Sequence, residues 1–345
     1  MRRKTTAIFC FFIMSILIMD TKTVLQATAE GIDLCVKTVI PALFPFVFLS
    51  TPLTAVLLGT QSAILKPLGA LLRLPKGSES IWLVGALGGY PVGARCIGQA
   101  VKGGVLSQMD GKRMLCFCSN AGPSFIFGMG MAILEDIRLC FLVWLIHIIS
   151  AFVVALLTPG KTNVSNTLPQ AAIPSISEII KQTVSSMAMI CSWVIVFRIL
   201  ITLMDRWLFW CLTNELQLII TGLLELTNGC CRLQEIQSTA SRFMIFSLFL
   251  SFGGLCVTMQ TAGVIDSMGG VLTGYLPAKI TQAAISLIIS SLLMIAVYPN
   301  EPRIRPSFLF AAVIVIISYR LTANQKNILE NQKTMMYNGT TLHTR

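Results

Sequence analysis

Apolar blocks of membrane-spanning length recur along this chain of 345 residues. The clearest are 137–157, 184–204, 243–265 and 280–297, each with at most one charged residue. A helix needs about 20 consecutive apolar residues to cross the hydrocarbon core of a bilayer, and only 12% of this chain is charged. The blocks lack the alternation of a transmembrane β-strand. The sequence therefore predicts an all-α, polytopic membrane protein with about eight to eleven membrane segments.

Two apolar stretches are interrupted at their centres by glycine, proline and polar side chains. They read G-A-L-G-G-Y-P-V-G-A-R at 85–95 and C-F-C-S-N-A-G-P-S-F-I-F-G at 116–128. Lipid cannot satisfy the N–H and C=O groups that a broken helix frees, so such breaks survive only within protein or beside a cavity. Two breaks this close in sequence predict broken or re-entrant helices around a binding site inside the membrane.

The first break offers four candidate ligand-binding residues, Tyr90, Pro91, Gly93 and Arg95. Pro91 suits the first turn of a second half-helix, because its missing N–H costs nothing there. The N–H groups of that half-helix would face an electronegative ligand. Tyr90 offers a ring and a hydroxyl, and Arg95 offers a charge. The alternative is that the glycines serve close helix packing and that Arg95 reaches the cytoplasmic surface.

The second break adds Ser119, Asn120, Pro123 and Ser124 as candidates. Asn120 brings a donor and an acceptor into an apolar span, and the two serines bring hydroxyls. Pro123 would start a new half-helix beside an unwound turn. The alternative is that these side chains form hydrogen bonds between helices.

The second half of the chain offers Glu225, Thr227 and Gln260. A carboxylate at membrane depth is costly, which makes Glu225 a functional candidate. It could bind a polar ligand or take Na⁺ or H⁺ as a coupling ion. The alternative is that Glu225 reaches the membrane interface. Gln260 lies near a third glycine break, F-G-G-L-C-V-T-M-Q at 252–260.

Residues 158–175 are rich in Pro, Ser, Thr and Asn, which predicts a linker between two related membrane halves, 30–157 and 176–319. Residues 1–29 form an N-terminal membrane segment, either a retained helix or a signal peptide. Residues 320–345 form a polar, basic tail.

A weak internal repeat supports the two halves. Placing 81–98 over 246–263 aligns three glycines and one valine. The aligned pairs are Gly88 with Gly253, Gly89 with Gly254, Val92 with Val257 and Gly98 with Gly263. Paired glycine-interrupted segments point to a mid-membrane site at an inverted-repeat interface.

Signatures of soluble chemistry are missing from the sequence. There is no H-E-x-x-H, Walker loop or dinucleotide fingerprint, so we predict neither an enzyme nor a cofactor. The eleven cysteines and two histidines lack zinc spacing, so we predict no metal. Ser124 and His147 could form a serine–histidine pair, but G-P-S-F lacks the second glycine of a nucleophile turn. We assign the net charge of +11 to basic cytoplasmic loops and not to nucleic-acid binding.

Five motifs carry a resemblance to a known family, and the resemblance covers about 30–297. They are I-P-A-L-F-P-F-V-F-L-S at 40–50, G-Y-P-V-G-A-R at 89–95, S-N-A-G-P-S-F-I-F-G at 119–128, G-L-L-E-L-T-N-G at 222–229 and F-G-G-L-C-V at 252–257. On these residues the chain resembles the sporulation integral membrane proteins of the YlbJ type, within the group that carries the nucleoside-recognition "Gate" domain.

The resemblance implies a multi-pass protein of a bacterial plasma membrane, in the mother cell or forespore, needed for spore cortex formation. It also implies a small polar, nucleoside-like ligand. We therefore expect recognition or transport of such a solute, in contact with membrane lipid. The alternative is a non-transporting scaffold that recruits other sporulation membrane proteins.

Overall fold

The computed structural model describes residues 2–57, 64–158, 160, 174–266, 272 and 274–298. Within these residues every regular element is a helix, which confirms the predicted all-α polytopic membrane protein. The end of the predicted second half from residue 299, the tail 320–345 and most of the linker 158–175 lie outside the described residues. Six described segments are long and apolar enough to cross a membrane: Thr21–Leu57, Gln108–Leu134, Ile137–Leu157, Ile176–Trp207, Thr239–Ile265 and Tyr275–Val297.

The first half of the chain contains a long kinked segment, a pair of short helices, a broken helix and a straight helix. In order, its elements are α1 (Arg2–Met19), α2 (Thr21–Leu34), the π-helical turn η1 (Cys35–Val39), α3 (Ile40–Leu57), α4 (Lys66–Leu71), α5 (Glu79–Gly88), α6 (Val92–Lys102), α7 (Gln108–Cys118), α8 (Pro123–Leu134) and α9 (Ile137–Leu157). The predicted boundary at residue 29 falls within α2. Pro45 and Pro52 lie inside α3, so this part of the chain is a kinked span and not a re-entrant hairpin.

The second half repeats this series of elements. They are α10 (Ile176–Trp207), the short 3₁₀ turn η2 (Phe209–Cys211), α11 (Asn214–Leu224), α12 (Leu226–Arg232), the 3₁₀ turn η3 (Leu233–Glu235), α13 (Thr239–Phe252), α14 (Gly254–Asp266) and α15 (Tyr275–Val297). Helix α10 begins with a capping box in which Ser175 and Glu178 bond each other's backbone N–H groups, so this long helix starts well before the apolar block at 184–204.

Two pairs of short helices form re-entrant hairpins. Hairpin 1 (residues 79–102) consists of α5 and α6, and hairpin 2 (residues 214–232) consists of α11 and α12. Glycines let the two arms of each hairpin touch: a Cβ built on Gly85 would lie 3.3 Å from the Gly93 Cα, and one on Gly229 would overlap the Gly222 backbone. The break predicted within 81–101 therefore reverses the chain, and this segment does not cross the membrane.

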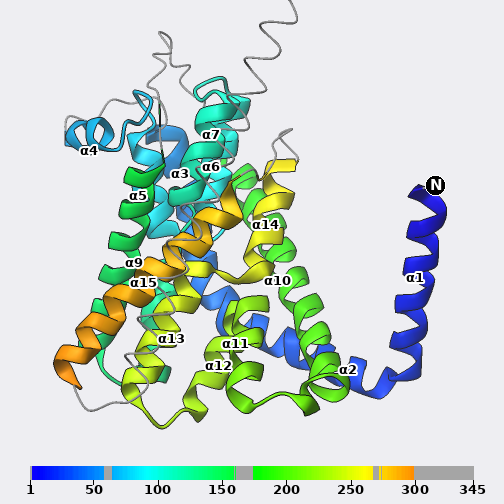
Figure 1. Cartoon of the computed structure of the whole chain (residues 1–345). Helices are drawn as coiled ribbons and strands as arrows, with labels where there is room; N and C mark the ends of the chain where they lie inside the picture. Colours follow the sequence, from blue (N-terminus) through cyan, green and yellow to red (C-terminus); the bar gives the residue numbers. More distant parts are fainter. Residues whose placement is uncertain are drawn as a thin grey trace, which may run out of the picture.

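The hairpins enter from opposite faces. From the middle of α7, Arg113 donates to the carbonyl oxygens of Leu72 and Thr158, which places hairpin 1 and the end of α9 at one face. At the start of α13, Arg242 donates to the Ile133 carbonyl at the end of α8, 3.1 Å away. Hairpin 2 runs into α13 and therefore opens at this second face. Figure 1 shows α5 and α6 in the upper half of the molecule and α11 and α12 in the lower half.

The order of elements is similar in the two halves. Each half contains a long helix, a hairpin, a broken helix and a second long helix: α3, hairpin 1, α7–α8 and α9, then α10, hairpin 2, α13–α14 and α15. This order pairs the turn at Gly89 with the turn at Glu225, and the break at Ser119 with Gly253. The sequence alignment of 81–98 with 246–263 was wrong, because it matched a hairpin turn to a broken helix through glycines that both structures need.

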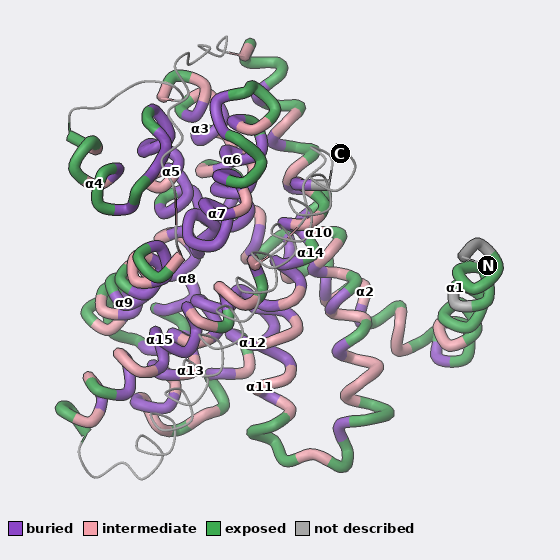
Figure 2. Tube along the Cα trace, turned by 45° about the horizontal axis from the view of Figure 1, so that its top comes forward, coloured by how far each residue is buried: buried purple, intermediate pink, exposed green. Residues whose placement is uncertain are grey.

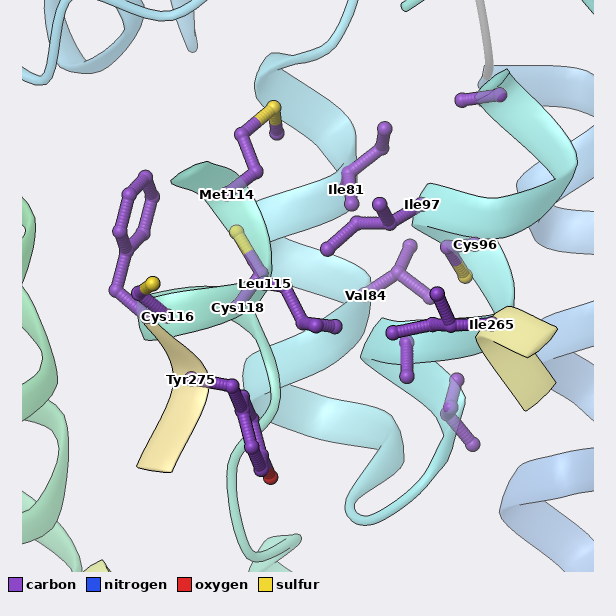
Figure 3. Close-up of a cluster of buried hydrophobic side chains, with 14 of the residues drawn as sticks. Ile81, Val84, Cys96, Ile97, Met114, Leu115, Cys116, Cys118, Ile265 and Tyr275 are labelled. Carbon is purple, nitrogen blue, oxygen red and sulfur yellow. The ribbon is translucent and has the colours of Figure 1, made fainter. Parts of the chain in front are cut away.

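The core lies where the hairpins meet the broken helices. Figure 2 shows α7 largely buried, whereas α1 is mostly exposed and carries large apolar side chains such as Phe11 and Ile18. Figure 3 shows side chains of α5, α6 and α7 packed with Ile265 of α14 and Tyr275 of α15. Helices of both halves therefore contribute to one core.

Candidate functional site

Four interrupted turns meet at the centre of the molecule. A Cβ built on Gly89 would lie 2.9 Å from the backbone nitrogen of Gly122, so the tip of hairpin 1 touches the α7–α8 break. A Cβ on Gly253 would lie 3.1 Å from the Tyr90 hydroxyl, and one on Gly254 would lie 3.2 Å from the Leu226 nitrogen. The two hairpin tips and the two helix breaks thus form one contiguous region.

Glycine is required at these contacts by backbone conformation as well as by space. Gly89, Gly253 and Gly254 have φ values of +79°, +81° and +81°. This left-handed region carries a steric cost for residues with a Cβ. The predicted breaks at 88–89 and 253–254 are therefore real chain interruptions, and not only points of close helix packing.

A small cavity of about 40 Å³ lies between the tips. This volume has room for a few water molecules but not for an organic solute. Its few polar side chains come from hairpin 1, hairpin 2 and α14, and the rest of its lining is apolar. The residues are Val39, Leu43, Tyr90, Ala121, Gly122, Phe125, Ile190, Val194, Glu225, Leu226, Thr227, Val257 and Gln260. The central site thus surrounds a small, mostly apolar cavity with a few polar side chains.

Glu225 forms the turn of hairpin 2 and is 2% exposed. Its Oε1 accepts a hydrogen bond from the backbone N–H of Thr227 at 3.1 Å. Its Oε2 accepts from the backbone and the side-chain amide of Asn228, at 2.7 and 2.6 Å. Glu225 therefore caps α12, and its charge lies at the positive end of that helix. The alternative in which Glu225 reaches the interface is not what the structure shows.

A polar chain connects Glu225 to the outside of the bundle. The Oδ1 of Asn228 accepts from Nη1 of Arg198 at 3.0 Å, and Arg198 forms an ion pair with Glu30 of α2. Glu30 is the carboxylate partner of Arg198 that the sequence alone does not identify. Because the chain crosses from α2 through α10 to α12, it ties hairpin 2 to the long helices beside it.

The α7–α8 break is held by a second buried network. Asn120 donates from Nδ2 to the Phe117 carbonyl at 2.7 Å, and its Oδ1 accepts from Gln282 Nε2 at 3.1 Å. The Ala121 N–H donates to Nε2 of His147 at 3.0 Å. Nε2 is therefore an acceptor, so in neutral His147 the proton lies on Nδ1, which faces Ser251 Oγ at 3.1 Å.

Lys279 lies at the centre of this network and was not predicted. It is 0% exposed, and its ammonium donates to the Ser119 carbonyl and to Gln282 Oε1 at 2.8 Å. The same Nζ lies 5.2 Å from the ring centre of Tyr90 and 5.8 Å from that of Tyr275. The sequence did carry a signal for this residue. Lys279 is a charged residue directly before residue 280, where the predicted apolar block begins.

Several predicted residues have roles other than lining the cavity. Arg95 points to α10 and α3, with Nη1 2.9 Å from Ser186 Oγ. Gly93 packs against the Cys118 carbonyl at the end of α7. Ser124 donates to the Ala42 carbonyl at 2.8 Å and does not pair with His147.

The other predicted residues lie at the tips. Tyr90, Glu225, Thr227 and Gln260 line the cavity. Pro91 directly precedes α6, and Pro123 is the first residue of α8, as the half-helix argument requires. Ser119 contributes its backbone carbonyl, which Lys279 binds. Asn120 acts through Gln282 and holds the break from behind.

Comparisons with known proteins complete the description of the site. Searches against models of protein families, curated proteins and solved structures found no match to this chain. Across the described residues, no group of three or more His, Cys, Asp or Glu side chains is arranged to hold a metal ion. The chemistry of the site therefore has to be argued from its own geometry.

Proposed function

We propose that the protein recognises a small polar solute and transports it across a bacterial plasma membrane. One observation carries the proposal: two hairpins from opposite faces and two broken helices meet at one small cavity where Tyr90, Glu225, Thr227 and Gln260 lie among apolar side chains. Irregular backbone at membrane depth is costly unless it surrounds a site. Interrupted helices at the interface of inverted repeats are the arrangement that transporters use for solute binding near the midplane.

The cavity lining favours a solute with both donors and acceptors and a flat apolar face. Glu225 Oε1 accepts one bond from the protein and has capacity for another from a ligand donor. Helix α8 begins at Pro123 beside the cavity, so its first N–H groups offer donors to ligand acceptors. Tyr90 and Phe125 supply rings for stacking. A nucleoside has these three features, in agreement with the ligand that the Gate-domain resemblance implies.

Alternating access would come from movement of the hairpins. The cavity is too small for a nucleoside, so a tip has to withdraw before the solute enters. An open hollow of about 1060 Å³ lies at the other end of hairpin 2 and is lined by residues of this hairpin and α13 that include Glu215, Arg232 and Ser241. Hairpin 2 contributes to both spaces, and its withdrawal would join them. Hairpin 1 would open the opposite face by the equivalent movement.

The loops give an orientation. We assign the face where hairpin 1 opens to the cytoplasm, because several basic residues lie close to the helix ends there. These residues are Lys66, Arg73, Lys76, Lys102, Lys112 and Arg113. Hairpin 2 then opens away from the cytoplasm. In a spore-forming cell, solute movement in either direction would serve cortex formation, the role that the family resemblance implies.

A ligand screen on the purified full-length protein tests this function. The panel consists of nucleosides, amino sugars and small peptides, read as thermal shifts. A ligand at 100 times its Kd stabilises the folded protein by about 2.7 kcal/mol. We expect stabilisation by a nucleoside, and its loss in Thr227→Val and Gln260→Ala. Ser192→Ala on the exposed side of α10 is the control that retains the shift. A flat panel would favour the scaffold.

A further inference from the structure

Lys279 lies against the C-terminal end of a broken helix. Its ammonium donates to the carbonyl oxygen of Ser119, the residue at which α7 ends. The last carbonyls of a helix have no partners within the helix and carry a partial negative charge. Among the described residues, no carboxylate forms an ion pair with Lys279. The end of α7 therefore offsets this buried charge in place of a carboxylate.

The surroundings of Lys279 fit an ammonium ion and not a neutral amine. A second oxygen, Oε1 of Gln282, accepts a hydrogen bond from Nζ at 2.8 Å. The ring centres of Tyr90 and Tyr275 lie 5.2 and 5.8 Å from Nζ, and aromatic ring faces attract cations. A neutral amine would bring a lone pair among these oxygens and ring faces, which repel it. We therefore treat Lys279 as a cation.

The hydrogen bonds of Lys279 join the α7–α8 break to α15. Gln282 lies on α15 one turn from Lys279, and its Nε2 donates to Oδ1 of Asn120 at 3.1 Å. Asn120 donates in turn to the Phe117 carbonyl near the end of α7, at 2.7 Å. These bonds involve neither hairpin, so they persist when a hairpin moves. The charge therefore stays at the break in every state that keeps α15 in place.

We propose that Lys279 is a resident cation, a covalently attached ammonium that takes the place of a coupling sodium ion at the α7–α8 break. In transporters with interrupted helices, unwound carbonyls and the C-terminal ends of half-helices coordinate the coupling ion. Here the ammonium of Lys279 already binds that carbonyl end. The inference rests on the proposed transport function, and it implies that the solute moves without sodium coupling.

A sodium ion would not share this position with Lys279. A second unit charge about 4 Å away would bind roughly 1,000-fold more weakly at an effective dielectric constant near 20. Glu225, the other candidate for a cation site, caps α12 and already accepts from three donors of that helix. Removal of the ammonium would leave the Ser119 carbonyl and Gln282 Oε1 as oxygen ligands for an added cation. Loss of Lys279 should therefore create a need for an external cation.

Chemical rescue of Lys279→Ala tests the proposal on the full-length protein in nanodiscs, without any solute. Alanine removes a side-chain segment with the size and charge of n-propylammonium. We expect the variant to unfold at a lower temperature than wild type and to recover when n-propylammonium is added. At 100 times its Kd, this additive should raise the ratio of folded to unfolded protein about 100-fold. Wild-type protein should be equally stable in sodium chloride and choline chloride at the same ionic strength.

The controls separate the charge of Lys279 from the space it fills. 1-Propanol, which fills the same volume without a charge, should restore much less stability than n-propylammonium. Lys279→Met should be destabilised and should not respond to n-propylammonium, because its thioether side chain occupies the space. Lys102→Ala, at the exposed end of α6, should behave as wild type throughout.

Three results would overturn the assignment. They are a rescue by n-propylammonium no greater than that by 1-propanol, a Lys279→Met protein as stable as wild type, and a wild-type protein that sodium stabilises more than choline. If Lys279→Ala does not fold, Lys279→Met and the wild-type salt series still decide. A failed ligand screen with an intact rescue would reject the solute while leaving the resident cation. A positive screen without a rescue would do the reverse.

Discussion

Replacing Gly222 by alanine should destabilise hairpin 2 strongly for so small a change. A Cβ at this position would overlap three ring atoms of Phe249, the farthest of them at 2.5 Å. Phe249 is 0% exposed, so its ring has no free space to move into. The other arm of the hairpin blocks relief as well, because Gly229 lies against the Gly222 backbone. Overpacking of this kind costs about 1–3 kcal/mol, which is about a 5- to 150-fold loss in the folding equilibrium.

The assay is reversible unfolding by SDS in mixed micelles, followed by tryptophan fluorescence. Gly128→Ala is the matched control, because nothing lies within 4 Å of a Cβ at that helical position. We expect Gly128→Ala to stabilise the protein by about 0.5–1 kcal/mol, the usual gain of alanine over glycine inside a helix. The two substitutions are chemically identical, so their opposite signs isolate the contact with Phe249.

A double variant checks the cause. Phe249→Leu alone leaves a void and destabilises, but it also removes the ring atoms that a Cβ on Gly222 would meet. The combined variant should therefore lose at least 0.5 kcal/mol less than the sum of the single losses. Strict additivity, or a Gly222→Ala protein as stable as wild type, would refute the close packing of hairpin 2 on α13.

Three further predictions follow from the same contacts. Arg198→Ala breaks the link from Glu30 to Asn228 and should cost about 1 kcal/mol, because the pair is partly exposed and screened; no change on SDS unfolding would show that the chain does not hold hairpin 2. Gly253→Ala places a Cβ at a φ of +81° and should cost about 1–2 kcal/mol by the same assay, whereas wild-type stability would mean that the α13–α14 break does not hold this conformation. In intact cells a membrane-impermeant maleimide should label the exposed Cys211 and Cys231 near hairpin 2. If a variant with both cysteines changed to serine is labelled as strongly as the wild-type protein, the proposed orientation is contradicted.

The positions of the chain breaks could be predicted from the sequence, because they depend on local chemistry. Glycine is the residue that adopts positive φ without strain, and proline suits the start of a helix. The turns at Gly89 and Gly253 and the helix starts at Pro91 and Pro123 follow directly. The buried position of Glu225 was also predictable, since a carboxylate within an apolar segment needs partners, and Asn228 three residues later supplies them.

The direction of the chain after each break could not be predicted. A broken helix and a hairpin turn require the same residues, and only packing decides between them. At Gly89 the chain reverses because Gly85 and Gly93 let α5 and α6 touch, whereas at Ser119 it continues across the membrane. For the same reason the repeat was misaligned, although the presence of two related halves was expected.

The sequence by itself determined that this chain is a helical membrane protein with interrupted helices, because hydrophobicity and backbone preference act over a few residues. Only the tertiary structure decided which side chains share the site. Arg95 and Ser124 lie beside the breaks in sequence but bond to α10 and α3. Lys279 lies 160 positions from Ser119 and yet binds its carbonyl. Such a partnership depends on how helices from both halves cross, and no local pattern encodes that crossing.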